Sequence, residues 1–214
     1  MKSQVRGGTR WKRFAVVMVP SVAATAAIGV ALAQGALAAS FSVSGQSFKV
    51  TADRLEGKGF AQYGAIDSGK SLDGSKVERH PVAVSAFREA TINGMCQSVL
   101  TPTPFGNVSL ILKAGGDKNK PVTADNLYID VADLQADATF SNIDIGVAAQ
   151  DAGKGPGMKP GEVQQQKANP FGFAQQADTA VLTNVKQTAW ATTAGTFRLS
   201  GLKMSLTMGT KECY

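Results

Sequence analysis

One octapeptide has the letters of a nucleotide-binding loop. Residues 64–71 read Gly-Ala-Ile-Asp-Ser-Gly-Lys-Ser and fit the pattern G-x-x-x-x-G-K-[ST] at every defined position. Phosphate binding by this pattern needs a buried strand before the loop and a helix that begins at the lysine. Here Leu72-Asp73-Gly74-Ser75 follows, and this segment disfavours a helix. We therefore expect a Gly/Ser turn rather than a phosphate site.

Ester hydrolysis by a serine nucleophile would need a G-x-S-x-G elbow and a histidine base. The chain contains no such pentapeptide, and His80, which precedes Pro81, is its only histidine. A serine triad would have to use His80, in a segment that reads as a loop entering a strand. We interpret His80 as a surface or strand-edge residue and assign no catalytic residue. A zinc site is not expected either, because one histidine and two distant cysteines do not supply a ligand set.

Carboxylates and aromatic residues offer weaker signals. A calcium site is conceivable from an acidic run that comprises Asp125, Asp130, Asp133, Asp137 and Asp144. The spacing of these residues matches no calcium loop. We therefore expect solvent-facing carboxylates and no metal or other cofactor. Trp190, Phe171 and Phe173 could line an apolar groove; a core tryptophan and a loop-anchoring phenylalanine pair are the preferred interpretation. Stacking faces for nucleic acid are not evident.

Residues 1–39 have the pattern of an export signal. Residues 1–13 carry five basic residues and no acid, residues 14–32 are apolar or small, and Ala36-Leu37-Ala38 offers a peptidase site. An uncleaved anchor is the alternative, because 19 apolar residues could just span a bilayer. Pro20, Gly29 and the small residues favour cleavage, between Gln34 and Ser40. We expect a secreted or extracytoplasmic, cell-envelope protein.

The basic excess belongs to this signal. The whole chain has a formal charge of +6, but residues 40–214 contain 17 basic and 16 acidic residues, so no nucleic-acid partner is expected. Residues 40–214 suit one β-rich domain. Because export and an even cysteine count favour oxidation, we predict a disulfide between Cys96 and Cys213, with two buried or intermolecular thiols as the alternative.

Alternation of apolar and polar residues predicts an all-β domain of antiparallel strands in a twisted sheet or sandwich. Half-buried strands are expected where apolar residues occupy every second position, at 41–52, 108–112, 127–131, 143–145 and 202–208. Residues 83–88 are the one stretch with a weak helical alternative. Residues 151–170, rich in Gly, Pro and Gln, are expected to form a flexible surface loop.

Two hexapeptides resemble each other. Residues 50–55 and 122–127 agree at five of six positions, as V-T-A-D-x-L. A looser theme, with Asn or Gly before an apolar residue, recurs at 92–95, 140–143 and 182–185. These repeats fit similar hairpin units in one irregular sheet, with chance similarity as the alternative.

Several segments also carry a family resemblance: residues 11–14, 50–53, 59–63, 176–179 and 186–197. With them the chain resembles an uncharacterised family of exported actinobacterial proteins, some of which are labelled cholesterol esterase. The label implies lipid or sterol ester hydrolysis, but the family offers no catalytic residues to carry over. V-T-A-D-x-L before a glycine-rich strand is also similar to β-structured envelope lipid carriers. We expect a non-catalytic envelope protein that binds a lipid or other hydrophobic ligand; an ester hydrolase and a structural partner of a membrane protein are the alternatives.

Overall fold

The computed structural model describes Met18 and residues 44–214. The chain divides into two compact units, residues 1–40 and 41–214, and in the first unit only Met18, which is helical, is described. The predicted export signal and its cleavage site therefore lie outside the described residues apart from Met18. Within the described part of the chain, no helix is long and apolar enough to cross a membrane.

Residues 44–214 are built almost entirely from antiparallel strands, which confirms the predicted all-β class. Residues 83–88, the stretch with a helical alternative, lie in the second strand. The described elements are β1 (Phe48–Lys70), β2 (Val77–Asn93), β3 (Met95–Thr103), β4 (Gly106–Ala114), β5 (Val122–Ser141), β6 (Asp144–Ala148), the short 3₁₀ helix η1 (Ala149–Asp151), β7 (Phe173–Thr193), β8 (Thr196–Arg198) and β9 (Lys203–Met208).

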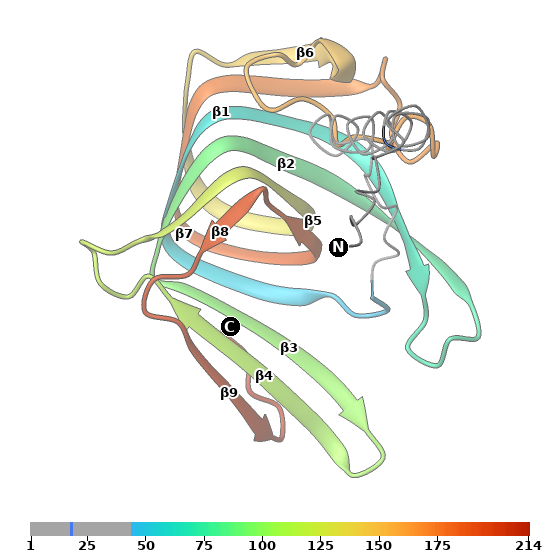
Figure 1. Ribbon diagram of the computed structural model, residues 1–214, viewed down its shortest axis with the longest axis vertical. Helices are drawn as coiled ribbons and strands as arrows, with labels where there is room; N and C mark the ends of the chain where they lie inside the picture. The colour runs from blue at the N-terminus through green and yellow to red at the C-terminus, as the bar shows by residue number, and fades with distance from the viewer. Residues whose placement is uncertain (1–17, 19–43) are drawn as a thin grey trace, which may run out of the picture. The chain divides into compact units, whose positions relative to one another are not determined.

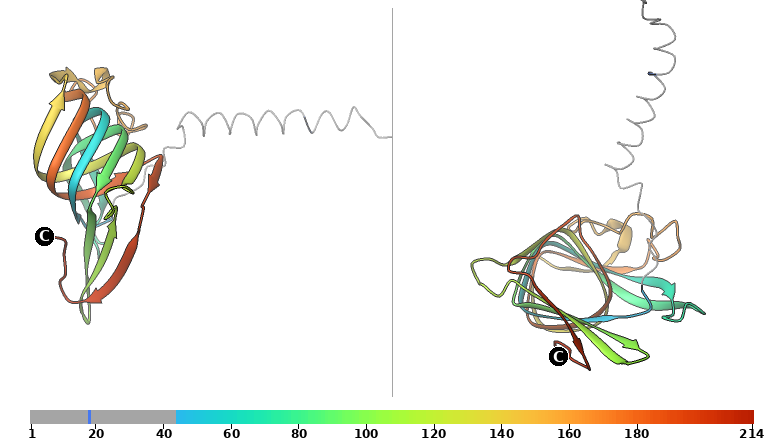
Figure 2. Two further views of the ribbon diagram at one scale, coloured as in Figure 1. Left: turned by 90° about the vertical axis from the view of Figure 1, so that its left-hand side faces the viewer. Right: turned by 60° about the horizontal axis from the view of Figure 1, so that its bottom comes forward.

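Four long strands close the sheet into a ring. β1 pairs with β2, β2 with β5, and β5 with β7, while β7 also pairs with β1 along most of its length. The ring is visible as stacked, curving ribbons in Figure 1 and as an enclosed outline in the right-hand view of Figure 2. β6 extends the sheet beside β7, and β8 pairs with β5. Closure gives the ring an inner and an outer face.

Local irregularities let these strands bend far enough to close. β5 shifts register against β7 three times between Asp130 and Asp137. In β7, Asn184 has a φ of 54°, and its Nδ2 donates to Asp137 Oδ2 at 2.8 Å. Asparagine tolerates this left-handed backbone better than other non-glycine residues. The Asn of the recurring theme at residues 182–185 therefore marks a bend beside a bulge.

The main apolar core fills the inside of the ring. Side chains of alternate residues from all four ring strands meet there, and Phe60 packs against Phe87 and Phe140 with ring centroids 5.4 and 5.2 Å apart. Gly57 makes room for this packing, because a Cβ atom at that position would lie 2.1 Å from Phe87 Cδ1. The inner face thus accounts for the apolar alternation of β1, β2, β5 and β7.

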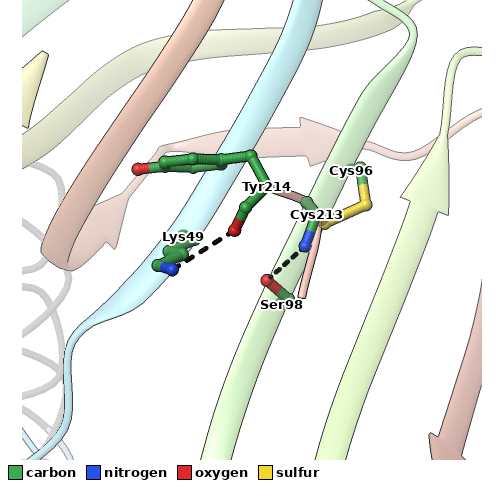
Figure 3. Close-up of a disulfide and its surroundings, with 5 residues drawn as sticks. All are labelled: Lys49, Cys96, Ser98, Cys213 and Tyr214. Atoms are coloured by element: carbon green, nitrogen blue, oxygen red, sulfur yellow. Dashed lines mark hydrogen bonds between the residues drawn. A yellow bond between two sulfur atoms is a disulfide. The ribbon is translucent and has the colours of Figure 1, made fainter. Parts of the chain in front are cut away.

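Strands β3, β4 and β9 leave the ring as a three-stranded extension, which we call the wing (Figure 1). One face of the wing is covered by the C-terminal residues 209–214. Ser109 Oγ donates to Gly209 O at 2.7 Å and accepts from Lys211 N, and Ser98 Oγ accepts from Cys213 N at 3.0 Å. The predicted disulfide between Cys96 and Cys213 is present and fixes this tail to β3 (Figure 3).

Within residues 44–214, no element covers the other face of the wing, which corrects one expectation. The alternation over residues 202–208 correctly predicts a strand, β9, but its apolar side chains are exposed rather than half-buried: Leu202, Met204, Leu206 and Met208. Leu206 is 70% exposed, and Phe105 at the tip of the β3–β4 turn is 89% exposed. Alternation reports that a strand has an apolar face, but not that another element covers it.

Residues 152–172, which we call the strap, run irregularly across the outer face of the ring. Arg88 of β2 donates from Nε and Nη2 to the carbonyl oxygens of Lys154 and Gly153 at 2.9 and 2.8 Å. Ile66 N donates to Lys167 O at 2.8 Å. A second, smaller apolar cluster lies on this outer face and includes Ala61, Val84 and Ala174. The Gly- and Pro-rich composition of residues 151–170 therefore corresponds to an irregular segment that packs on the sheet.

Candidate functional site

A cavity of about 200 Å³ lies inside the ring. Side chains from all four ring strands line it: Leu55, Phe60, Gln62, Ser85, Phe87, Ile129, Leu134, Ala136, Ala138, Phe140, Gln175, Leu182, Val185 and Gln187. Most of these residues are aliphatic or aromatic, and two of them, Ala136 and Ala138, are small residues on β5. Since Leu134 is 39% exposed while it lines the cavity, the wall formed by the second half of β5 also meets solvent.

The cavity also has a defined polar side. Gln175 Nε2 donates to Gln62 Oε1 at 2.6 Å, and Gln62 Nε2 donates to Ser85 Oγ at 2.8 Å, so three side chains form one hydrogen-bonded row across β7, β1 and β2. Gln187 is buried and lines the cavity on the same inner face. Amide and hydroxyl groups can donate and accept hydrogen bonds, so this side suits a neutral or carboxylate polar group.

A smaller cavity of about 30 Å³ adjoins the first. The two share Leu55, Ile129, Val185 and Gln187 in their walls. The smaller cavity is also lined by Met95 and Gln97 of β3, which is a wing strand. The inner face of the ring therefore continues toward the uncovered face of the wing.

Size and lining restrict what the interior can hold. An apolar cavity of about 150 Å³ stays dry and binds benzene, whereas pockets for drug-sized ligands measure about 300–1,000 Å³. At about 200 Å³ the larger cavity suits an alkyl chain or a single ring. A whole sterol ester is larger than this space. The chemistry offered is burial of a slender apolar group with a polar group held at the glutamine side.

A cluster of ionisable side chains lies beneath the strap, on the outer face. Lys159 Nζ donates to both carboxylate oxygens of Asp130, and Tyr63 Oη donates to Glu162 Oε2 at 2.7 Å. Tyr63 Oη also accepts from Lys159 N at 2.8 Å. Asp130 is 1% exposed and its ammonium partner comes from the strap, so this ion pair fixes the strap to β5. Burial raises the pKa of both Glu162 and Tyr63 above their ordinary values.

Asp67 is the residue of this cluster that holds a proton near neutral pH. Burial, and then the negative charge of nearby Asp130, raise the pKa of Asp67 from 3.8 to about 7. The side chain is 6% exposed, and its Oδ2 has no hydrogen-bond partner among the described residues. When protonated, Asp67 can donate to the Asp130 carboxylate, which an ionised Asp67 cannot do. The proton on Asp67 thus allows its carboxyl group to lie beside the Asp130 carboxylate.

His80 lies in β2 opposite Asp67 and stacks on Trp190, with ring centroids 3.5 Å apart. Its Nε2 is 3.7 Å from Glu78 Oε2 and forms no hydrogen bond within residues 44–214. The structure therefore brings no serine hydroxyl into hydrogen-bonding distance of this nitrogen in the described part of the chain. Trp190 packs on the outer cluster rather than in the ring interior.

The remaining sequence candidates do not meet at one place. The octapeptide 64–71 forms the end of β1 and the start of the β1–β2 turn, without a helix. Of the five predicted solvent-facing aspartates, Asp130 is buried, and no group of three or more His, Cys, Asp or Glu side chains that could hold a metal occurs in the described residues. Phe171 and Phe173 are exposed and do not anchor the strap.

Sequence reasoning missed the inner polar row and the cluster under the strap. Gln62, Ser85 and Gln175 are ordinary polar residues on alternating strands, and only ring closure brings them together. Asp130 could have been identified from the sequence, because it is the one charged residue within the apolar run Leu127–Val131. A carboxylate among residues that are all buried must be paired.

Comparison with known proteins assigns a family and no activity. Searches among curated proteins and among solved structures find no match. Residues 44–214, which include every strand of the ring and the wing, match the model described as "Family of unknown function (DUF6230)", and the chain belongs to this family.

Proposed function

We propose that this is an exported, non-catalytic protein that binds a slender hydrophobic ligand, such as the alkyl chain of a lipid, inside the ring. The observation that carries the proposal is the cavity of about 200 Å³, with aliphatic and aromatic walls and one row of hydrogen-bonded polar side chains. The alkyl chain would lie against the walls formed by Leu55, Phe60 and Leu182. A polar head would face the glutamine side.

The size of the cavity gives the sharpest test. We would titrate the purified protein with a series of linear alkyl carboxylates by calorimetry. Each added methylene should strengthen binding about fourfold, from about 0.8 kcal/mol per buried CH₂, until the chain fills the cavity. Affinity should then stop rising. Affinities that do not depend on chain length, or no binding at any length, would overturn the proposal.

A pair of variants ties the binding to the cavity. Ala136→Phe places a phenyl ring in the cavity wall, since Ala136 is partly buried and lines the cavity. Gln135→Phe adds the same ring to the neighbouring residue, which is exposed on the other side of β5. The first variant should shorten the longest chain that binds, or abolish binding, while the second should bind like the wild type. Equal effects would place the ligand elsewhere.

Export carries its own prediction. If residues 1–39 are an export signal, the secreted protein should begin between Gln34 and Ser40, and mass measurement of that protein reports the N-terminus directly. The disulfide supports an oxidising destination, since disulfides persist there and are rare in the cytosol. Recovery of the intact basic N-terminus in the membrane fraction would show an anchor instead.

The ester hydrolase alternative is tested at His80. A serine triad needs an imidazole base, and this is the only histidine in the chain. We expect no ester hydrolysis by the purified protein, and therefore none to be lost in His80→Ala. If the wild type hydrolyses a lipid ester and the folded His80→Ala protein does not, the binding proposal is replaced by an enzymatic one.

A further inference from the structure

The uncovered face of the wing is apolar along β4 and β9, while β3 contributes Val99 between the polar residues Gln97 and Thr101. The register of the three strands forms one row from Val99, Leu110 and Leu206. In the next row, Leu112 lies beside Met204. Met208 opposite Val108 continues the face toward the β3–β4 turn, where Phe105 is exposed. A contiguous exposed apolar surface of this kind marks an interaction site in a folded protein.

The wing and its base also have a net positive charge, whereas the rest of the described unit has a net negative charge. Residues 94–121 and 199–214 contain five lysines and two acidic residues, whereas the rest of residues 44–214 contains 12 basic and 14 acidic residues. Lys113 and Lys203 lie directly opposite each other on β4 and β9. Like charges placed opposite each other destabilise a sheet, so the sheet itself does not explain this pair.

These lysines are free to attract an anionic partner. In the part of the chain that the structure describes, the ion pairs do not include Lys113, Lys118, Lys120, Lys203 or Lys211. Lys113, Lys120 and Lys203 line one open cleft at the base of the wing. Lys113 and Lys203 lie on the face opposite the apolar one, about one sheet thickness away. This distance is comparable with the screening length of about 8 Å at physiological salt.

We propose that the wing docks on an anionic lipid surface, with its apolar face in the interfacial region and its lysines attracted to the lipid phosphates. Charge favours this occupant over a second copy of the chain, because an anionic bilayer offers phosphates to these lysines and a second basic wing offers no excess of negative charge. The combination of exposed apolar residues and adjacent lysines is the one that binds such interfaces.

The docked wing would lead toward the ligand cavity. Leu112 packs against the inner core of the ring, and Met95 and Gln97 of β3 line the smaller cavity that adjoins the larger one. An alkyl chain could therefore pass from a lipid surface along the wing into the ring. This last step alone rests on the proposed function, and docking itself does not.

Two neighbouring tryptophan substitutions test which face meets lipid. Leu206→Trp places an indole on the apolar face and Ser205→Trp places one on the opposite face of the same exposed strand. Each full-length variant would be mixed with phosphatidylcholine vesicles, with and without phosphatidylglycerol, whose acyl chains carry bromine as a quencher. Trp11, Trp190 and the apolar segment at residues 14–32 are the same in both variants and cancel in the comparison.

We expect bromine to quench the added indole of Leu206→Trp and to leave that of Ser205→Trp emitting. Lys113→Gln and Lys203→Gln should each weaken docking of Leu206→Trp about fivefold, from about 1 kcal/mol per lysine near an anionic surface. No quenching in either variant, or equal quenching in both, would overturn the proposal. So would burial of the Leu206→Trp indole without lipid together with concentration-dependent dimers, which would identify a second copy as the occupant.

The alkyl carboxylate titration, repeated on the same variants, separates the two proposals. Leu206→Trp and Lys203→Gln lie outside the cavity lining and should bind alkyl carboxylates as the wild type does. Loss of docking with intact ligand binding would refute only the wing proposal. Docking without ligand binding would refute only the cavity proposal.

Discussion

Replacing Asp67 by asparagine should change how the stability of this protein depends on pH. The carboxyl group of Asp67 has a pKa of about 7 in the folded protein and 3.8 as its ordinary value, because it is buried beside Asp130. The folded state therefore binds this proton more tightly than the unfolded state does. The stability that the proton contributes is fully present below about pH 4 and is lost as the pH rises through about 7.

The size of the effect follows from the two pKa values. Each pKa unit corresponds to about 1.4 kcal/mol, and between pH 5 and pH 8 the proton is lost over about two units. Asp67 alone should therefore cost the wild type about 2–3 kcal/mol of unfolding free energy over this range. Asparagine is close in shape and can donate to Asp130 at every pH.

Urea unfolding at several pH values between about 5 and 8 measures the effect. Asp67→Asn should flatten the fall in stability with rising pH and should be more stable than the wild type at pH 8. Part of the dependence of stability on pH should remain in Asp67→Asn, because burial also raises the pKa of Glu162. Asp73→Asn is the control: hydrogen bonds from Ser71 and Ser75 lower the pKa of Asp73 to about 2, so its loss changes no slope in this range. Parallel curves for wild type and Asp67→Asn would refute the reasoning.

Two further predictions concern the covalent tie and the inner core. Replacing Cys96 and Cys213 by serine should lower the unfolding free energy by about 4–5 kcal/mol, because the bridge closes a loop across 117 positions. Denaturation of the double variant beside oxidised and reduced wild type measures this loss. A denaturation midpoint equal to that of the oxidised wild type would contradict the prediction. Gly57→Ala should cost about 1–3 kcal/mol, since its Cβ would meet the Phe87 ring at 2.1 Å. Gly64→Ala, where a Cβ has no neighbour within 4 Å, should cost less, and equal losses would count against the packing argument.

The sequence predicts individual strands well because alternation is a local property. The structure has strands β4, β5 and β9 at three of the predicted segments, residues 108–112, 127–131 and 202–208. The even cysteine count likewise predicts the bridge that the structure shows. Which element covers each face of a strand is not a local property of the sequence. Leu206 alternates with polar neighbours as regularly as Leu110 does, yet no other element within residues 44–214 lies over it. A charge placed at Leu206 therefore meets solvent and should leave the protein folded.

The candidate site depended on closure, which no local pattern encodes. The inner cavity exists because β7 pairs with both β1 and β5, and the β1–β7 pairs that close the ring are more than 100 positions apart in the sequence, as for Val50 and Gln187. The recurring Asn or Gly theme was visible at residues 140–143 and 182–185. Its meaning, a positive φ at Asn142 between β5 and β6 and at Asn184 beside irregular pairing, could be read only from the backbone.

The pairing of the first long strand with the last also governs the order of folding. A ribosome releases β1 well before β7, and until residues 173–193 emerge, β1 has only β2 and β3 as partners and the ring stays open. Long-range pairing of this kind slows folding, because loop-closure entropy must be overcome before the contacts form. A nascent chain of this protein therefore stays open, and accessible to translocation or chaperones, until nearly all of it has been made.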